Sequence, residues 1–170
     1  MSLGIRPFTK GLHDLGAKTY AWIQPDGGWG WSNAGLVVDD DQSLLIDTLF
    51  DVNLTREMLD AMQTAESQAT GSIDTLVNTH SNGDHCNGNE LVANAEIISS
   101  KTTAEELANE TPDRLAERMR RAPEMGETGV FLQQCFGAFD FENIKKTLPT
   151  RTFEGNLKIS CGDKAVHLKE

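Results

Sequence analysis

The sequence predicts an α/β fold, because segments typical of β-strands alternate along the chain with segments typical of helices. Short runs of aliphatic and β-branched residues show the two-residue alternation of strands, and the polar stretches between them repeat apolar residues at helical spacing. No internal repeat, low-complexity tract or linker divides the 170 residues. Residues 1–170 are therefore predicted to form a single domain.

The first strand pair is predicted at residues 35–38 and 43–47, which are apolar runs on either side of an acidic stretch. Residues 39–42 are expected to form the turn between them, because aspartate tolerates turn conformations. A β-hairpin is therefore expected to open the fold.

Two aromatic segments each have two interpretations. The glycine-rich segment 24–31 carries Trp29 and Trp31, and it is either a loop folded onto its own core or one wall of a substrate site. Residues 130–141 contain four of the seven phenylalanines and are predicted to be helical. This second segment is either a core helix or an apolar wall beside an active site.

Helix signals occur in three places after the first hairpin. Asn53 is expected to cap a helix whose apolar residues recur at helical spacing, and Thr103 with Glu106 has the pattern of a capping box. Thr111 followed by Pro112 is expected to begin a further helix, since proline is favoured in the first turn.

Four later segments have the residue patterns of strands, namely 73–79, 95–98, 156–159 and 165–168. The first of these is apolar on both faces, which indicates a largely buried strand that ends at His80. The last two alternate apolar and polar residues, so they are expected to be half-buried strands around a turn.

Composition and charge exclude several classes of function. The chain has 26 acidic residues against 15 Lys and Arg, a formal net charge of −11, so its surface should repel nucleic acid and anionic lipid. No apolar run is long enough to span a membrane, and no signal peptide is recognised, which predicts a soluble, cytoplasmic protein. Three widely spaced cysteines fit a reducing compartment better than a disulfide framework.

The segment that indicates chemistry is T-H-S-N-G-D-H-C-N-G-N, residues 79–89, directly after the predicted buried strand. Four candidate ligands fall within six residues: His80, Asn82, Asp84 and His85. Gly83 permits a turn that brings the side chains on either side of it to one cavity. Imidazole and carboxylate donors suit zinc, and also iron or manganese, whereas two imidazoles disfavour a calcium or magnesium site.

This segment resembles the H-x-H-x-D-H signature of the metallo-β-lactamase superfamily, which follows a strand and is preceded by an aspartate that closes an earlier strand. Here that aspartate is Asp47, at the end of L-L-I-D-T. The similarity extends from about residue 12 to about residue 100 and includes the segments 32–38 and 88–91. It implies the family's αββα sandwich, of which this sequence matches the N-terminal half, a sheet covered by helices on one face.

The resemblance implies a metal-dependent hydrolase, in which a metal-activated water attacks an ester, thioester, lactone, amide or phosphoester of a small-molecule substrate. His80 would ligate a first metal ion, while Asp84 and His85 would ligate a second. Asp84 would also orient or deprotonate the water, and Asp47 would hold the loop from outside the ligand set. Zinc is the expected ion, one or two per chain, with iron or manganese as alternatives.

Two departures from the family pattern weaken this implied site. Asn82 replaces the middle histidine, and because an amide oxygen binds zinc less strongly than imidazole, its ligand role would be weak or vestigial. The family's later ligands are absent, since His167 is the only histidine after His85 and its surroundings are typical of a strand. Cys86 is expected to be a small buried residue rather than a ligand.

Because only the first half of the family fold is matched, the chain is expected to be truncated at its C-terminus, with one face of its sheet open. A homodimer that covers the open face is expected, since soluble monomers rarely expose so large an apolar surface. The alternative function is a noncatalytic half-domain that self-associates. Redox chemistry at an iron ion is a third hypothesis.

Overall fold

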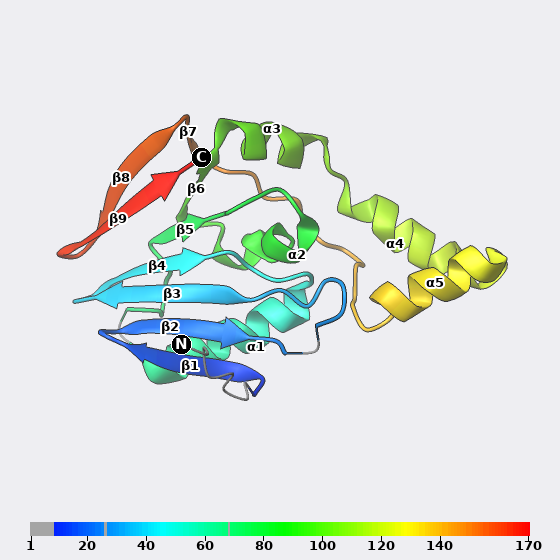
Figure 1. Cartoon of the computed structure of the whole chain (residues 1–170), viewed down its shortest axis with the longest axis horizontal. Coiled ribbons are helices and arrows are strands. Elements are labelled where there is room, and N and C mark those ends of the chain that lie inside the picture. Colours follow the sequence, from blue (N-terminus) through cyan, green and yellow to red (C-terminus); the bar gives the residue numbers. More distant parts are fainter. Residues whose placement is uncertain (1–8, 26, 68) are drawn as a thin grey trace, which may run out of the picture.

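The computed structural model describes residues 9–25, 27–67 and 69–170, and a seven-stranded mixed sheet lies at its centre (Figure 1). Four strands form an antiparallel meander: β1 (Gly11–Gly16), β2 (Thr19–Ile23), β3 (Ala34–Asp39) and β4 (Gln42–Ile46). Three more continue the sheet in parallel: β5 (Thr75–Val77), β6 (Glu96–Ser100) and β7 (Arg151–Phe153). The predicted α/β class is confirmed.

One face of the sheet carries the main core and is covered by helix α1 (Val52–Ala65) (Figure 1). Met58 and Met62 of this helix pack against Leu36, Leu45 and other strand residues that are fully buried. The alternation of the strands explains this, because every second side chain points to the helix-covered face.

The opposite face is partly covered by a separate two-stranded hairpin, formed by β8 (Asn156–Cys161) and β9 (Lys164–Lys169). Its half-buried apolar residues pack against Leu44, Val77 and Ile98 of the large sheet. The hairpin was predicted from its alternating pattern, but its place on the face expected to be open was not. Dimerisation through the remainder of that face stays a prediction.

Two short segments of sheet were missed by the sequence analysis. The chain's first hairpin is β1–β2, one hairpin earlier than predicted, and its turn places Ala17 and Lys18 at φ values of 50° and 52°. Neither residue is typical of such a turn, which favours glycine or asparagine, so the turn carried no sequence signal. The strand β7 has only three residues and was not predicted.

Two predicted helix starts were wrong by two or three residues. Asp51 caps α1, because its carboxylate accepts a hydrogen bond from the backbone N–H of Leu54 at 2.7 Å. Helix α3 (Lys101–Asn109) begins after Ser100, whose hydroxyl accepts from the N–H of Thr103 at 3.2 Å. The helix expected after Thr111 is confirmed.

Helices α4 (Pro112–Arg121) and α5 (Gly126–Phe136), joined by a short 3₁₀ turn, extend beyond the edge of the sheet (Figure 1). The predicted helix over 130–141 ends at Phe136. Phe139 and Phe141 follow it in irregular chain and are buried with Phe50 in an aromatic cluster. No helix of the described part of the chain is long and apolar enough to cross a membrane.

Candidate metal centre

The candidate metal centre lies where two neighbouring parallel strands end. Asp47 follows β4 directly, and His80 lies three residues beyond the end of β5. Asp47 adopts a left-handed conformation, φ 62°, while its N–H donates to the carbonyl of Val77 at 2.9 Å. Because the carboxyl ends of parallel strands meet at one edge of a sheet, Asp47 and His80 are brought together there although they are far apart in the sequence.

Ligand atoms of Asp47, His80 and His85 all lie within 4.8 Å of one another. His85 belongs to the one-turn helix α2 (Gly83–Cys86), and its ring centroid lies 4.1 Å from that of His80. Its Nδ1 lies 2.9 Å from Oδ2 of Asp47, and its Nε2 lies 3.5 Å from Oδ2 of Asp84. His80, Asp84 and His85 were predicted to share one cavity. In the structure His85 lies beside both other residues, but the ligand atoms within 4.8 Å of one another belong to Asp47, His80 and His85, and Asp84 is outside that group.

Thr79 determines which ring nitrogens carry protons. Its N–H donates to Oδ1 of Asp47 at 2.7 Å, and its hydroxyl donates to Oδ2 at 2.7 Å. Since a hydroxyl has one proton, the contact of 2.9 Å between Thr79 Oγ1 and His80 Nδ1 requires that Nδ1 be the donor. His85 Nδ1 likewise donates to the carboxylate of Asp47. Both neutral imidazoles therefore keep an unprotonated Nε2.

The electrostatics of His85 reflect two opposing effects. Burial alone would lower the pKa of His85, because a charged imidazolium is poorly solvated there. The hydrogen bond to Asp47, with the negative charges of Asp47 and Asp84, outweighs burial and raises the pKa above the ordinary value of 6.5. A positive charge on this ring, or beside it, is therefore favoured by the site.

A buried polar network supports the loop from behind. The carbonyl of His85 accepts from the N–H of Thr48 at 3.0 Å and from the amide of Asn78 at 3.1 Å. Asn89, which is fully buried, donates to Asn78 at 2.8 Å and accepts from Thr48 at 3.0 Å. Since buried polar groups are costly unless paired, this network fixes the position of α2.

Two other residues of the motif, Asn82 and Cys86, are not part of the cluster of Asp47, His80 and His85. Asn82 is exposed, and its backbone carbonyl accepts from the N–H of His85 at 2.9 Å. Cys86 is buried, and its thiol donates to the carbonyl of His80 at 3.1 Å. Burial raises the pKa of Cys86, and the carboxylates of Asp47 and Asp84 raise it further, so the thiol stays protonated. His167 is exposed on β9 and is outside the cluster of Asp47, His80 and His85.

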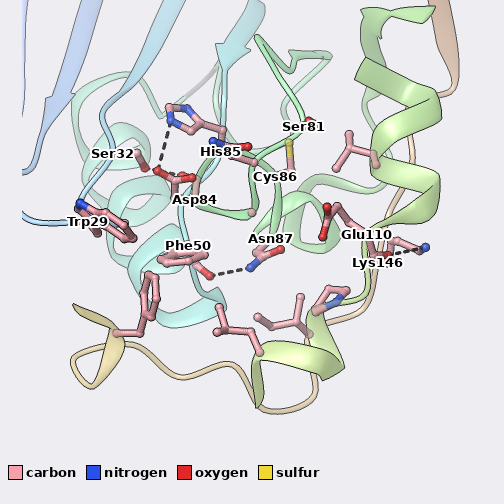
Figure 2. Close-up of a pocket in the computed structure, with 18 of the residues that line it drawn as sticks. Trp29, Ser32, Phe50, Ser81, Asp84, His85, Cys86, Asn87, Glu110 and Lys146 are labelled. Carbon is pink, nitrogen blue, oxygen red and sulfur yellow. Dashed lines mark hydrogen bonds and ion pairs between the residues drawn. The ribbon is translucent and has the colours of Figure 1, made fainter. Parts of the chain in front are cut away.

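The centre borders a pocket of about 790 Å³, on whose wall Asp84 and His85 lie (Figure 2). The pocket is bounded on other sides by the loop 28–33 and by residues from the ends of α3, α4 and α5. The hydroxyl of Ser32 donates to the carbonyl of Asp84 and so links that loop to α2.

Sequence reasoning missed Thr79, Asn78 and Asn89 as parts of the site. A signal was present, because Asn78 and Thr79 are polar residues at the end of a buried strand, immediately before the first candidate ligand. Nothing in the local sequence pattern indicated that Asn89 would form hydrogen bonds with Asn78 and Thr48.

A family model described as "Metallo-beta-lactamase superfamily" matches residues 27–152. A search of curated proteins found no significant match. Among solved structures, a metallo-beta-lactamase from Pontibacter korlensis is similar, with a TM-score of 0.57 and 18% identity over 94% of this chain. The match covers 59% of that protein, so this chain spans less than two thirds of the relative's length.

Proposed function

Because the chain belongs to the metallo-beta-lactamase superfamily, we propose that it is a metal-dependent hydrolase of small-molecule substrates. The bond that it hydrolyses is that of an ester, thioester, lactone, amide or phosphoester. The observation that supports this proposal best is the shared proton arrangement of His80 and His85, in which each neutral ring carries its proton on Nδ1, with Nε2 of His85 3.5 Å from the carboxylate of Asp84.

The donor set fits a transition ion. Two imidazoles with carboxylate oxygens suit zinc, and also iron or manganese. Two donors of one tetrahedral ion, each about 2.0–2.2 Å from it, lie about 3.3–3.6 Å apart. The separation of 3.5 Å between Nε2 of His85 and Oδ2 of Asp84 agrees with that value.

We assign His80, Asp84 and His85 as the residues that would hold the ion, with Asn82 at most a weak addition. Asp47 is 4% exposed and already accepts three hydrogen bonds, so its role is to orient His85 and the strand-loop junction. The chemistry that such an ion supplies when bound is polarisation of the scissile group and activation of water near neutral pH.

The chain's own residues then have distinct tasks. Asp84, whose side chain is 24% exposed, lies on the pocket wall, where its carboxylate can accept a proton from an attacking water. Asp47 keeps the proton of His85 on Nδ1, and Thr79 does the same for His80. The network of Thr48, Asn78 and Asn89 holds α2, and with it both His85 and Asp84, in place.

Metal analysis and turnover together test the proposal. The purified chain should retain about one zinc or iron ion per chain and should hydrolyse at least one chromogenic ester, thioester or phosphoester. His85→Ala should lose both metal and turnover, while His167→Ala should keep both, because His167 is exposed outside the cluster. A metal-free, inactive protein would instead favour the noncatalytic alternative.

A further inference from the structure

Helices α4 and α5 form a helical hairpin that projects beyond the edge of the sheet (Figure 1). One stripe of α5 is open to solvent. Its members recur at three- and four-residue spacing and are all exposed: Glu127, Val130, Phe131 and Gln134. Phe131 is 50% exposed and Val130 is 58% exposed, although both side chains are large and apolar. This stripe therefore presents an apolar centre between two polar ends.

The apolar centre is held outward and extends to a neighbouring loop. A Cβ on Gly129 would lie 1.7 Å from the carbonyl oxygen of Ala122, so the contact of α5 with the preceding turn accepts only glycine. The ring of Trp29 lies 6.0 Å from that of Phe131 and is 65% exposed. Trp29, Val130 and Phe131 are three of the five large apolar side chains that are exposed in the described part of the chain. Since soluble monomers rarely gather exposed apolar groups in this way, the patch indicates a contact surface.

The charges of the hairpin are balanced, unlike those of the rest of the chain. Residues 112–136 contain four arginines and four acidic residues, whereas the whole chain has a formal net charge of −11. Two of the arginines form ion pairs with acidic residues of the same chain. The other charged side chains of the hairpin form no ion pair within the described part of the chain: Asp113, Arg114, Arg118, Glu124 and Glu127. Charges of both signs are therefore available for an intermolecular contact.

This balance favours a second copy of the chain over other partners. An isologous interface must complement itself, so it needs charges of both signs on one surface. Nucleic acid or an anionic membrane would instead require an excess of cations, which residues 112–136 do not have. When two hairpins lie antiparallel, Glu124 and Glu127 at the tip of one approach Arg114 at the base of the other, because α4 runs toward the tip and α5 returns from it.

The projection of the hairpin also limits repulsion between two acidic molecules. The 11 residues of α5 span about 16 Å, whereas charges in water are screened over about 8 Å at physiological ionic strength. Two copies that touch through their hairpins can therefore keep most of their remaining surfaces beyond that distance.

We propose that the exposed stripe of α5 is the interface of a symmetric homodimer, in which two antiparallel hairpins bring Val130 and Phe131 of both copies to the two-fold axis. Arg114 of each copy pairs with Glu127 of the other at the two ends of the interface. The contact lies on α5 rather than on the open sheet face expected from the sequence. It depends neither on a bound metal nor on the proposed hydrolase function.

Sedimentation velocity of the full chain tests the interface. The unsubstituted chain should sediment as a dimer at high micromolar concentration, and Phe131→Glu should sediment as a monomer, because two like charges would meet at the axis. Leu15→Glu is the matched control, since Leu15 is 65% exposed but lies on β1, and this variant should remain dimeric. Ala21→Glu should also remain dimeric. It adds a charge to the open sheet face, because the neighbouring Trp22 points into the main core on the helix-covered side.

Three results of this experiment would overturn the proposal: a monomeric unsubstituted chain, a dimer that survives Phe131→Glu, or a dimer that Ala21→Glu dissociates. The third result would place the contact on the open sheet face. A monomer that co-sediments with phosphatidylcholine vesicles would identify a membrane as the partner and would equally overturn the proposal.

Hydrogen exchange of the unsubstituted chain gives a second measurement, which does not depend on the folding of a variant. The backbone amides of residues 126–136 should exchange more slowly at high than at low protein concentration, because the dimer covers α5. The amides of β1 and β2 should exchange at the same rate at both concentrations. Concentration-dependent protection of the sheet instead of α5, or no such protection anywhere, would contradict the interface.

Exchanged charges test the antiparallel arrangement. Arg114→Glu and Glu127→Arg should each raise the dissociation constant of the dimer about two- to tenfold, the effect of disturbing exposed ion pairs. The double variant should recover an affinity close to that of the unsubstituted chain, because the swapped charges pair again between the two copies. If the double variant recovers none of the loss, the arrangement is wrong.

Discussion

Replacing Asp47 by asparagine removes one negative charge from the centre while keeping the shape of the side chain. Asp47 accepts hydrogen bonds from Thr79 N, Thr79 Oγ1 and His85 Nδ1 at 2.7, 2.7 and 2.9 Å. Two of these donors, Thr79 Oγ1 and His85 Nδ1, share Oδ2, and the third, Thr79 N, is on Oδ1. In Asp47→Asn the NH₂ group must face one of these two sets of donors, and in either orientation His85 loses its negatively charged partner.

Groups that orient a metal-ligating histidine usually contribute 10- to 100-fold to metal affinity, which corresponds to about 1.4–2.7 kcal/mol. We expect zinc binding to weaken by that factor, as measured by competition with a chromophoric chelator. The pKa of His85 in the metal-free protein should also fall, because the hydrogen bond and charge that raise it are lost. Titration of the His85 ring by NMR measures this shift.

Asp74→Asn is the matched control. Asp74 also accepts hydrogen bonds across strands, from the N–H and hydroxyl of Ser43, but it precedes β5 rather than following it. This variant should leave zinc affinity and the pKa of His85 unchanged. If Asp47→Asn changes neither quantity, the orienting role is wrong, and a loss far above 100-fold would indicate that Asp47 is itself a ligand.

Three further predictions concern packing, pH and thiol reactivity. Gly88→Ala should lower the free energy of unfolding by about 1–3 kcal/mol, because the new Cβ would lie 2.0 Å from Oγ1 of the buried Thr55. Gly71→Ala should be nearly neutral, since its Cβ would lie 3.6 Å from the nearest atom, the carbonyl oxygen of Ser67. Urea denaturation measures both changes. Zinc affinity, measured by calorimetry, should fall as the pH drops through the raised pKa of His85, beginning above pH 6.5. The thermal stability of the metal-free protein should instead fall as the pH rises through that pKa, because the protonated His85 forms a stabilising pair with Asp47 that is lost on deprotonation. A flat or reversed profile in either measurement would contradict this assignment. Iodoacetamide should modify Cys135 well before Cys86 and Cys161, which are buried and have raised pKa values, and peptide mass spectrometry would show any other order.

The parts of the fold that could be predicted from sequence are those whose signals are local. The hairpin of β3 and β4 joins two apolar runs through an acidic turn, and the hairpin of β8 and β9 shows strict alternation, so both were predicted close to their observed bounds. The loop of residues 79–89 was recognised as a candidate metal site because its possible ligands are close in sequence and Gly83 lies among them. Such patterns need no knowledge of distant contacts.

The parts that could not be predicted depend on contacts between distant residues. The role of Asn89 depends on Thr48 and Asn78, which reach it from two strand ends, and it also donates to the carbonyl of Thr147 at 3.2 Å. The proton arrangement of the imidazoles depends on Thr79, whose position beside Asp47 follows from the parallel pairing of β4 and β5. The pairing of β4 with β5 cannot be read directly from a single sequence.

The two interpretations of the tryptophan loop illustrate the same limit. Its composition allowed either a loop folded onto its own core or one wall of a substrate site. In the structure Trp31 packs against the buried aromatic cluster, whereas Trp29 is 65% exposed. Both indoles line the pocket, but Trp31 packs on Phe139 at 4.8 Å, whereas Trp29 lies beside Phe136 of α5 at 6.2 Å. Which indole would be covered could not be read from the segment 24–31 alone.

Diffraction from crystals of the full chain soaked in zinc, recorded on both sides of the zinc absorption edge, tests the central claim most directly. We predict an anomalous peak about 2.0–2.1 Å from Nε2 of His80 and of His85, with a carboxylate oxygen of Asp84 completing the protein ligands and Asp47 remaining hydrogen-bonded to Nδ1. A peak on the Nδ1 atoms, or no peak at this loop while zinc binds elsewhere on the chain, would contradict it.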